Sequence, residues 1–415
     1  MDNQVMTIFP SQLEGEVYIS GAKNAVLRHL AASIITDGAV TISNYPNNML
    51  DVQIHEEMLA VLGKQITKHS GTISITGTVN TSTLVWEKRS IRNTLLILGA
   101  LLAKTGEGRV PLPGGCSLGD RKYDIHVKLM EAMGAKVWQE DNYLCAKSKG
   151  RLQAVNFTLP IRSTGATENA IIMASLANGT SRIWNPHIRP EILDLIALLR
   201  KMGATIVVNG QESIVVEGSE SLERGVYHHA LGDNMQALTY LIAGAIAGKE
   251  LLIHKFPIAD LETPLIFLKF SGLSFFQDGT DLIVRKCKQY PVDISTGPYP
   301  GINSDMQPLF AVWGALSQGL STITDLRFVG RYGYAEEFAK MGVKSSIDNN
   351  RLLIYGGKPI CGGKEVTALD LRAGAALLLL GLVADGPTKI NDFWMIERGY
   401  DDLVPTLTKL GVTIK

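Results

Sequence analysis

Residues 111–121 surround a cysteine with groups that change its reactivity. The segment holds two prolines and three glycines around Cys116, and Asp120 and Arg121 follow closely. Proline and glycine at this density exclude a helix or a central strand, so the sequence predicts a long loop between two apolar helical stretches. A cationic neighbour lowers the pKa of a thiol and an anionic neighbour raises it. Cys116 is therefore a candidate reactive thiol in a ligand-facing loop, and a surface loop with an incidental cysteine is the alternative.

A second candidate site opens the first apolar helix, in the segment ISGAKNA at residues 19–25. Lys23 and Asn24 follow a turn of small residues, where the N-terminus of a helix attracts anions. The GxxxxGK[ST] spacing of a nucleotide-binding P-loop is absent from this segment. The sequence predicts an anion contact at Lys23, against the alternative of a solvated lysine at a helix start.

Several arginines lie near the ends of predicted elements rather than on polar helix faces. They are Arg89, Arg92, Arg121, Arg331, Arg372 and Arg398. The planar guanidinium fork matches carboxylate and phosphate oxygens. For any one of them a surface salt bridge is the better interpretation, but with so many at similar places in a repeated fold a shared anionic ligand becomes a competing interpretation.

Two more residues have both a structural and a chemical interpretation. Asp305 follows a run of turn residues and precedes an apolar helix, so by itself it is predicted to be a helix N-cap. His126, in the segment YDIH at residues 123–126, could equally be a histidine packed inside a helix or a residue of the site. The sequence contains no GxSxG, HExxH or protein-kinase motif set, which excludes several enzyme classes.

Two glycine markers recur through the whole chain. The first ends an apolar segment before a β-rich run, at intervals of 67–71 residues: Gly38, Gly108, Gly179, Gly248, Gly319 and Gly386. The second ends a helix before a strand, at intervals of 69–71 residues: Gly63, Gly134, Gly203, Gly272, Gly342 and Gly411. We interpret both sets as left-handed helix C-caps in units of strand, helix, strand, helix, strand. Six units predict two globular halves of three, with a crossing near residues 231–234.

The composition fits a soluble protein of more than one domain. The chain has 415 residues, 46% hydrophobic and 19% charged, with 40 basic and 40 acidic side chains. Zero net charge argues against a nucleic-acid or anionic-membrane partner. Four scattered cysteines without a CxxC pair predict neither disulfides nor a zinc site and fit a reducing cytoplasm. No signal peptide is recognisable, and the longest apolar run, residues 373–384, is too short to span a bilayer.

The motifs together resemble those of the enolpyruvyl transferase family over nearly the whole chain. They are SGAKNA at 20–25, PGGCSLGDR at 113–121, STGATEN at 163–169, SDMQ at 304–307, DLRAGAA at 370–376 and ERGY at 397–400. The resemblance implies an α/β (α+β) fold of two inverse α/β barrel domains, each built from three βαβαββ repeats. It implies one domain of residues 22–230 and a second of residues 1–21 plus 231–415. The active site is then expected in the cleft between them, with the cysteine loop as its lid and with no metal or cofactor.

The resemblance also implies residue roles. Lys23, Arg121 and Arg398 match the positions that hold the phosphate of phosphoenolpyruvate, and Arg331 and Arg372 match those that hold its carboxylate. Cys116 matches the proton-donating lid cysteine, and Asp305 matches the general base at the acceptor hydroxyl. The expected catalytic set is Cys116, Asp305, Lys23 and Arg398. The expected acceptor contacts are Asn24, Arg92, Arg121, Asp124, His126, Ser163, Thr164, Gly165, Asp305 and Arg327.

Five positions depart from the family pattern, mostly on the acceptor side. Ile161 replaces a phosphate-binding lysine, Lys122 a proline, Met395 a histidine, Arg189 an acidic residue and Arg327 a small apolar residue beside the sugar. Arg162 is adjacent, but neighbouring residues on a strand point to opposite faces, so Arg162 cannot simply replace the lysine. The departures leave the reaction intact and put the identity of the acceptor in question.

The resemblance implies an enzyme that transfers an enolpyruvyl group from phosphoenolpyruvate to a hydroxyl of a uridine nucleotide, with release of phosphate. The 3′-hydroxyl of UDP-N-acetylglucosamine is the first expectation, which would place the enzyme in cytoplasmic peptidoglycan biosynthesis. UMP, in nucleoside-antibiotic metabolism, is the alternative acceptor. A non-catalytic nucleotide-binding regulator is a further alternative, and the presence of Cys116, Asp305 and the arginines argues against it.

Overall fold

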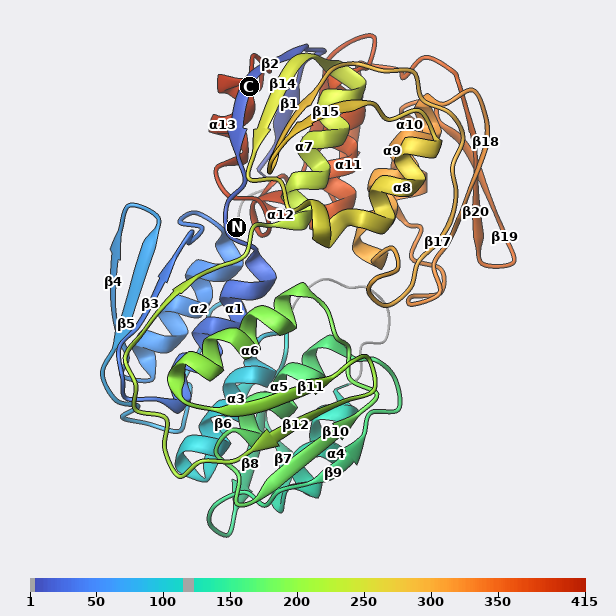
Figure 1. Ribbon diagram of the computed structural model, residues 1–415. Helices are drawn as coiled ribbons and strands as arrows, with labels where there is room; N and C mark the ends of the chain where they lie inside the picture. The colour runs from blue at the N-terminus through green and yellow to red at the C-terminus, as the bar shows by residue number, and fades with distance from the viewer. Residues whose placement is uncertain (1–3, 115–122) are drawn as a thin grey trace. The chain divides into compact units, whose positions relative to one another are not determined.

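The computed structural model describes residues 4–114 and 123–415, which fall into two compact units (Figure 1). One contains residues 21–114 and 123–231, and the other contains residues 4–20 and 232–415. Both units mix helices with parallel and antiparallel strand pairs, so the predicted α/β fold class is confirmed. Cys116, Arg121 and Lys122 lie outside the described residues.

The described residues between 21 and 231 form three sheets, six α-helices and a short 3₁₀ helix, Ser33–Ile35. Its elements are α1(Lys23–Ala32), β3(Val40–Ser43), α2(Leu50–Val61), β4(Gln65–His69), β5(Thr72–Thr76), α3(Thr94–Thr105), β6(Glu107–Pro111), α4(Asp124–Ala132), β7(Ala135–Glu140), β8(Tyr143–Ser148), β9(Asn156–Thr158), α5(Thr164–Ala174), β10(Thr180–Trp184), α6(Pro190–Met202), β11(Thr205–Asn209), β12(Ser213–Glu217) and β13(Val226–His229). The strand orders are β13-β3-β5-β4, β6-β8-β7 and β11-β12-β10-β9. Helices α1, α3 and α5 are buried over most of their surface, as expected for helices enclosed by the sheets.

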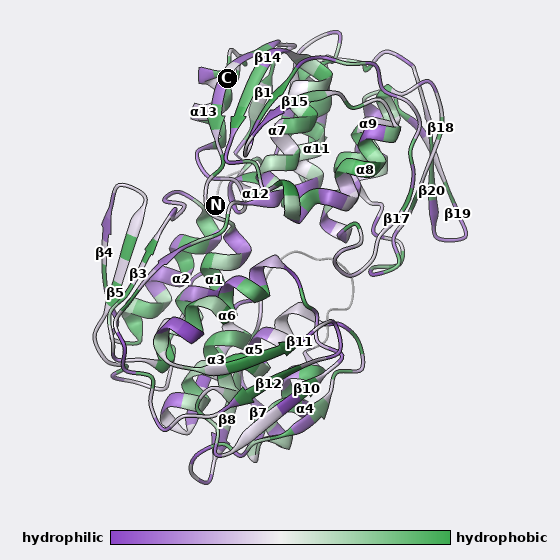
Figure 2. Ribbon diagram, viewed as in Figure 1, coloured by the Kyte–Doolittle hydropathy of each residue, from purple (hydrophilic) through white to green (hydrophobic). Residues whose placement is uncertain are grey.

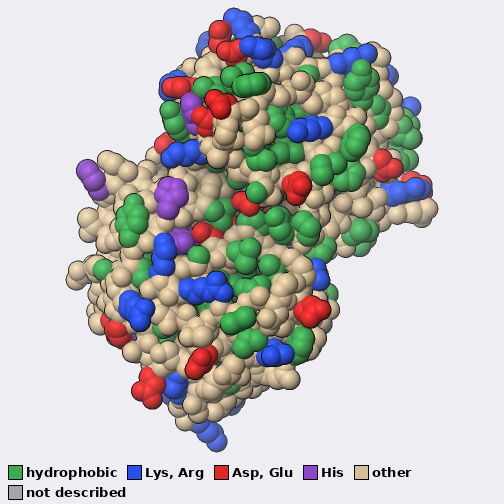
Figure 3. Space-filling view, viewed as in Figure 1, with side chains coloured by type: hydrophobic (Ala, Val, Ile, Leu, Met, Phe, Trp, Pro, Cys, Tyr) green, Lys and Arg blue, Asp and Glu red, His purple; other side chains and the backbone are tan. Residues whose placement is uncertain are grey.

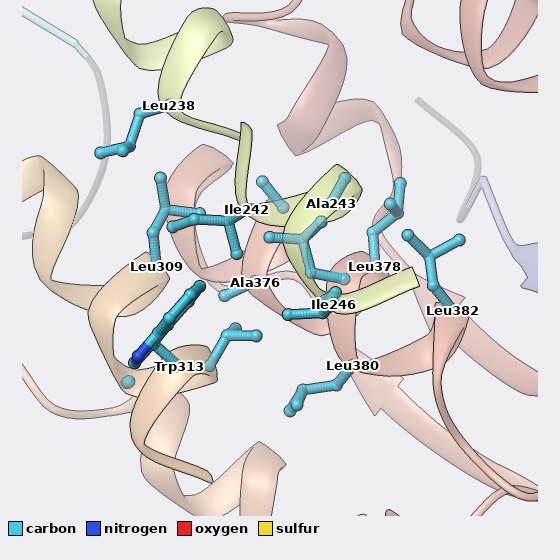
Figure 4. Close-up of a cluster of buried hydrophobic side chains, with 14 of the residues drawn as sticks. Leu238, Ile242, Ala243, Ile246, Leu309, Trp313, Ala376, Leu378, Leu380 and Leu382 are labelled. Atoms are coloured by element: carbon cyan, nitrogen blue, oxygen red, sulfur yellow. The ribbon is translucent and has the colours of Figure 1, made fainter. Parts of the chain in front are cut away.

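The other unit repeats this arrangement. Its elements are β1(Met6–Ile8), β2(Leu13–Tyr18), α7(Asn234–Ala247), β14(Gly248–His254), α8(Glu262–Phe270), β15(Phe275–Asp278), β16(Asp281–Val284), β17(Asp293–Ser295), α9(Gln307–Leu316), β18(Gly319–Thr324), α10(Tyr334–Lys340), β19(Lys344–Asp348), β20(Arg351–Gly356), β21(Lys364–Thr367), α11(Leu371–Leu382), β22(Thr388–Asn391), α12(Trp394–Glu397) and α13(Leu403–Lys409). Strand β2 pairs with β14 and β1 pairs with β22, which joins residues 6–18 to this unit. The buried helices α7, α9 and α11 meet around Trp313 (Figure 4).

Among the described residues, four of the six sheets contain four strands, one more than the strand–helix–strand–helix–strand pattern that we read from the glycine spacing. Four strands is the number in the βαβαββ repeat that the family resemblance implies. The order β17-α9-β18-α10-β19-β20 shows the complete unit, in which β17 and β18 are parallel and β19 and β20 form an antiparallel hairpin. The hairpin turns on Asn349 and Asn350, both with positive φ. Such a two-residue turn is easily read as part of one continuous β-rich run.

The prediction of left-handed helix ends is confirmed for the second set of glycines and is wrong for most of the first set. All six helix-ending glycines have positive φ, between 86° and 112°: Gly63, Gly134, Gly203, Gly272, Gly342 and Gly411. In the first set only Gly179 and Gly319 have positive φ. Gly38 and Gly248 serve close packing instead, because a Cβ would lie 2.7 Å from the carbonyl oxygen of Glu223 and 2.5 Å from that of Gly244.

The distribution of polarity follows this architecture. Hydrophobic residues are concentrated on the helices inside each unit, whereas the exposed strand β19 is largely hydrophilic (Figure 2). Lysine, arginine, aspartate and glutamate side chains are scattered over the visible face, in keeping with 40 basic and 40 acidic side chains (Figure 3). Within residues 4–114 and 123–415, no helix combines the length and the apolar character that crossing a membrane requires.

Candidate active site

A carboxylate and two arginines meet in the unit that contains α9 and α11. Asp305 lies in a short 3₁₀ helix, Ser304–Met306, directly before α9. It is not the N-cap that we predicted, because the Asn303 side chain caps this helix and accepts the Asp305 N–H at 3.0 Å. The Asp305 carboxylate instead faces the arginines. Arg331 Nη1 donates to Asp305 Oδ1 at 2.8 Å, and Arg372 Nε lies 4.0 Å from Oδ2.

Both guanidinium groups are buried and carry hydrogen-bond donors without a partner. Arg372 is only 1% exposed, and its guanidinium lies 5.2 Å from the centre of the Tyr400 ring. Among the described residues, Arg331 Nε and Nη2 and Arg372 Nε and Nη1 have no hydrogen-bond partner. Burial by itself lowers the pKa of Arg331, but the charges of Asp305 and Asp370 outweigh it and raise that pKa. Buried donors without partners are costly, so this cluster is suited to an anionic ligand.

Neighbouring polar groups hold these arginines in place. Asp370 Oδ1 accepts the N–H groups of Arg372 and Ala373 at 2.7 and 2.9 Å, and so caps α11. The fully buried Asp325 accepts the N–H groups of Arg327 and Phe328, which fixes the start of the loop that leads to Arg331. Sequence reasoning missed Asp325, although an aspartate at the end of a strand before a turn is a recognisable signal.

Gln307, in the first turn of α9, holds the end of the same loop. Its Nε2 donates to Asp325 Oδ2 and to the carbonyl oxygen of Arg331, both at 2.9 Å. The remaining predicted cations of this unit differ in burial. Arg398 is buried at the end of α12, with Nη1 3.8 Å from Met395 Sδ. Arg327 is exposed, with its guanidinium 5.0 Å from the centre of the Phe328 ring.

The other unit holds the predicted anion contact at the start of α1. Lys23 is buried, and its Nζ lies 3.3 Å from Asp51 Oδ2 on α2. Asn24 is half-buried, and its Oδ1 accepts from Arg28 Nη1 at 3.5 Å. Arg92 is half-buried and lies two residues before the start of α3. Arg28 was not singled out from the sequence, and its four-residue spacing from Asn24 is the signal that would have found it.

The predicted nucleotide contacts gather at the N-terminus of α5. Ser163 Oγ caps this helix and accepts the Ala166 N–H at 3.4 Å. Thr164 Oγ1 lies 2.8 Å from His187 Nδ1. Gly165 packs directly on His126, because a Cβ at this glycine would lie 3.3 Å from the imidazole. Asp124 lies on the same helix as His126 but is exposed, 3.8 Å from Lys128.

Residues 161 and 162 do not lie on a strand. Strand β9 ends at Thr158, and an irregular segment leads from there to α5. The predicted alternation of side chains therefore does not apply. Ile161 is 43% exposed, and Arg162 Nε donates to Asn185 Oδ1 at 3.4 Å. Arg162 lines an open pocket of about 510 Å³ together with Trp184 and Glu212.

Two buried histidines connect helices around these segments. His55 Nδ1 lies 3.0 Å from Asn93 Nδ2, and His126 Nδ1 lies 3.1 Å from Asn169 Nδ2. Burial lowers the pKa of each histidine from 6.5 to about 3, and nearby arginine charges add to this effect. As the pH falls below 6.5, the unfolded chain takes up protons that the folded chain does not, so stability is lost between pH 6.5 and 3.

We expect His55→Gln to reduce this loss of stability in acid. At pH 5, each buried histidine accounts for about 2 kcal/mol of lost unfolding free energy. Denaturant unfolding of the wild type and the variant at pH 7.5 and pH 5 measures the difference. His69→Gln, at an exposed position, is the control and should behave as the wild type does. An equal loss of stability in wild type and His55→Gln would show that His55 does not resist protonation.

Comparison with known proteins connects this chain to a family. The family model described as EPSP synthase (3-phosphoshikimate 1-carboxyvinyltransferase) matches residues 9–407. A protein of Halorhodospira halophila named UDP-N-acetylglucosamine 1-carboxyvinyltransferase is 35% identical over 408 residues, 97% of this chain and 96% of that protein. A protein of the same name from Rickettsia felis is 37% identical over 410 residues, 97% of each chain.

Solved structures share the fold. The enolpyruvyl transferase NikO from Streptomyces tendae matches with a TM-score of 0.90 and 24% identity, over 100% of this chain and 98% of that one. An EPSP synthase from Acinetobacter baumannii matches with a TM-score of 0.78 and 18% identity, over 99% of each chain. The family model and the two relatives together cover nearly the whole sequence, and the chain therefore belongs to the EPSP synthase family of enolpyruvyl transferases.

Proposed function

We propose that this chain transfers the enolpyruvyl group of phosphoenolpyruvate to a hydroxyl of a uridine nucleotide, with UDP-N-acetylglucosamine as the first candidate. The observation that carries the proposal is the Asp305 carboxylate beside two buried guanidinium groups with unpartnered donors. This combination offers a base next to an anion site, which the transfer requires. The names of the two relatives support the same reaction.

The proposed reaction is an addition followed by an elimination. Asp305 takes the proton of the acceptor hydroxyl, and the oxygen forms a bond to C2 of phosphoenolpyruvate. The C3 methylene gains a proton from Cys116, which gives a tetrahedral adduct. Phosphate then leaves C2 with the proton that Asp305 took from the hydroxyl, and the Cys116 thiolate takes a proton back from C3, so that the double bond and both side chains are restored. Atoms and charges balance without a cofactor or a metal.

The proposed substrate contacts follow the chemistry of each group. Arg331 and Arg372 bind the carboxylate of phosphoenolpyruvate, and Lys23, Arg121 and Arg398 bind its phosphate. Asn24, Arg92, Arg327 and the first turn of α5 bind the nucleotide. Preorganised cations stabilise the charge that develops on the tetrahedral adduct and on the departing phosphate. These substrates place the enzyme in the cytoplasm.

Arg327 favours UMP as a second candidate acceptor. Its exposed guanidinium lies where the family pattern has a small apolar residue, and no lysine stands at position 161. A guanidinium there crowds an N-acetyl-sugar but can bind a phosphate directly.

Initial rates of phosphate release with phosphoenolpyruvate and each nucleotide test the proposal. We expect turnover with UDP-N-acetylglucosamine, with UMP or with both. If UMP has the higher kcat/KM, Arg327→Val should raise its KM about 10- to 100-fold, because a charge-assisted contact of about 1.5–3 kcal/mol is lost. Nucleotide binding without any release of phosphate would favour the non-catalytic alternative.

A further inference from the structure

Two ion pairs with buried carboxylates lie in the same unit as Asn24 and the first turn of α5. Arg28 on α1 pairs with Glu168 on α5, with Nε and Oε1 2.8 Å apart. Arg189, directly before α6, donates through Nε and Nη2 to the two carboxylate oxygens of Glu191, both at 2.6 Å. Glu168 and Glu191 are almost completely buried. Two opposite pairs cancel in charge, which lowers the cost of burying them.

Arg28 also determines how Asn24 is presented. The two residues are four apart on α1 and therefore share a face of the helix. Arg28 Nη1 donates to Asn24 Oδ1 at 3.5 Å. A guanidinium has donors and no acceptor, so the carbonyl end of the amide must face Arg28. The Nδ2 donors of Asn24 then point away from Arg28.

Arg28 connects two segments that we assign to the acceptor. Asn24 lies in the first turn of α1, and Glu168 lies one turn after Ser163, Thr164 and Gly165 on α5. Glu168 is 0% exposed, and within the described part of the chain neither of its carboxylate oxygens makes a hydrogen bond, so its contact with Arg28 Nε is an ion pair. Arg28 is thus the principal charge partner of a deeply buried carboxylate, and the same guanidinium reaches Asn24.

We propose that Arg28 is a positioning residue for acceptor binding. It holds Asn24 with its NH₂ group directed to the nucleotide, and it fixes the first turn of α1 against α5. The nucleotide atom that contacts Asn24 must then accept a hydrogen bond, so it is a carbonyl, ring or phosphate oxygen. This inference rests on the proposed function, in which Asn24 contacts the nucleotide.

Arg28→Lys separates positioning from charge neutralisation. Lysine keeps the positive charge beside Glu168 but lacks the fork that reaches Glu168 and Asn24 together. We expect the KM of the acceptor to rise about 10-fold, while the KM of phosphoenolpyruvate and the melting temperature change little. Arg151→Lys is the matched control, because Arg151 also uses its fork, on the carbonyl oxygens of Leu176 and Ala177 in the same unit. It should leave the acceptor KM unchanged.

A double-mutant cycle with Asn24→Ala tests whether Arg28 acts through Asn24. We expect Arg28→Lys to have little further effect on the acceptor KM once Asn24 is removed. An unchanged acceptor KM in Arg28→Lys, or additive effects of the two substitutions, would overturn the inference and leave a structural ion pair. If Arg28→Lys does not fold, Glu168→Gln takes its place and is combined with Asn24→Ala in the same double-mutant cycle.

The test distinguishes this inference from the proposed function. Phosphate release by the wild type with UDP-N-acetylglucosamine or UMP establishes the function independently of any variant. If the wild type releases no phosphate, the double-mutant cycle is repeated with the Kd of each nucleotide, measured by calorimetry, in place of the KM. Coupled effects on Kd would support positioning by Arg28 in a binding protein. A wild type that binds neither nucleotide would contradict both proposals.

Discussion

Asp305→Ala is expected to lower turnover by ~10²–10⁴-fold and to leave nucleotide binding close to that of the wild type. The size of the loss is that of a positioned general base. The physical reason is the location of the carboxylate. It does not cap a helix, and it is held 2.8 Å from Arg331 and 4.0 Å from Arg372. Steady-state rates of phosphate release and calorimetry with the nucleotide measure the two quantities.

Two further variants distinguish the role of Asp305 as a general base from its role as the ion-pair partner of Arg331. Asp305→Asn keeps the shape and an oxygen that accepts from Arg331, but it cannot take a proton, so turnover should fall nearly as far as in Asp305→Ala. Asp348→Ala removes an exposed carboxylate that pairs with Arg351 at 2.9 Å and should leave turnover unchanged. Near-normal turnover of Asp305→Asn would mean that Asp305 only holds Arg331 in place.

The sequence predicted those parts of the fold that depend on short-range physics. The six helix-ending glycines have positive φ because a residue without Cβ is needed where each helix stops. The α/β class and the family resemblance are confirmed. The glycine spacing alone did not separate the two strands of the β19–β20 hairpin, because the turn at Asn349 and Asn350 carries neither glycine nor proline. The βαβαββ repeat that the family resemblance implies contains both strands.

The contacts around the site depend on residues far apart in the chain and could not be predicted from local patterns. Asp305 looked like an N-cap, yet Asn303 supplies that cap. Asp325 holds a loop through bonds to Arg327 and Phe328. The ion pair between Arg28 and Glu168 joins residues 140 positions apart, and each residue alone resembles a solvated helix residue. The roles of Cys116 and Arg121 remain proposals that rest on the family resemblance.

Arg372→Lys is expected to raise the KM of phosphoenolpyruvate about 10- to 100-fold. Arg372 is buried, so the positive charge has no route to solvent, and lysine keeps that charge. What is lost is the planar fork, with two donors, Nε and Nη1, that make no hydrogen bond to a described residue. The loss of one charge-assisted hydrogen bond to the substrate carboxylate, about 1.5–3 kcal/mol, corresponds to this range.

The acceptor KM is the internal reference for this prediction. It should change less than the KM of phosphoenolpyruvate, because Arg372 is assigned to the carboxylate and not to the nucleotide. Binding of phosphoenolpyruvate is also measured by calorimetry, since KM equals Kd only when chemistry is slow. Arg351→Lys, at an exposed ion pair, is the matched control and should change neither constant. A rise confined to the acceptor KM would reassign Arg372 to the nucleotide, and the unpartnered donors would then match a phosphate of the acceptor rather than the carboxylate of phosphoenolpyruvate.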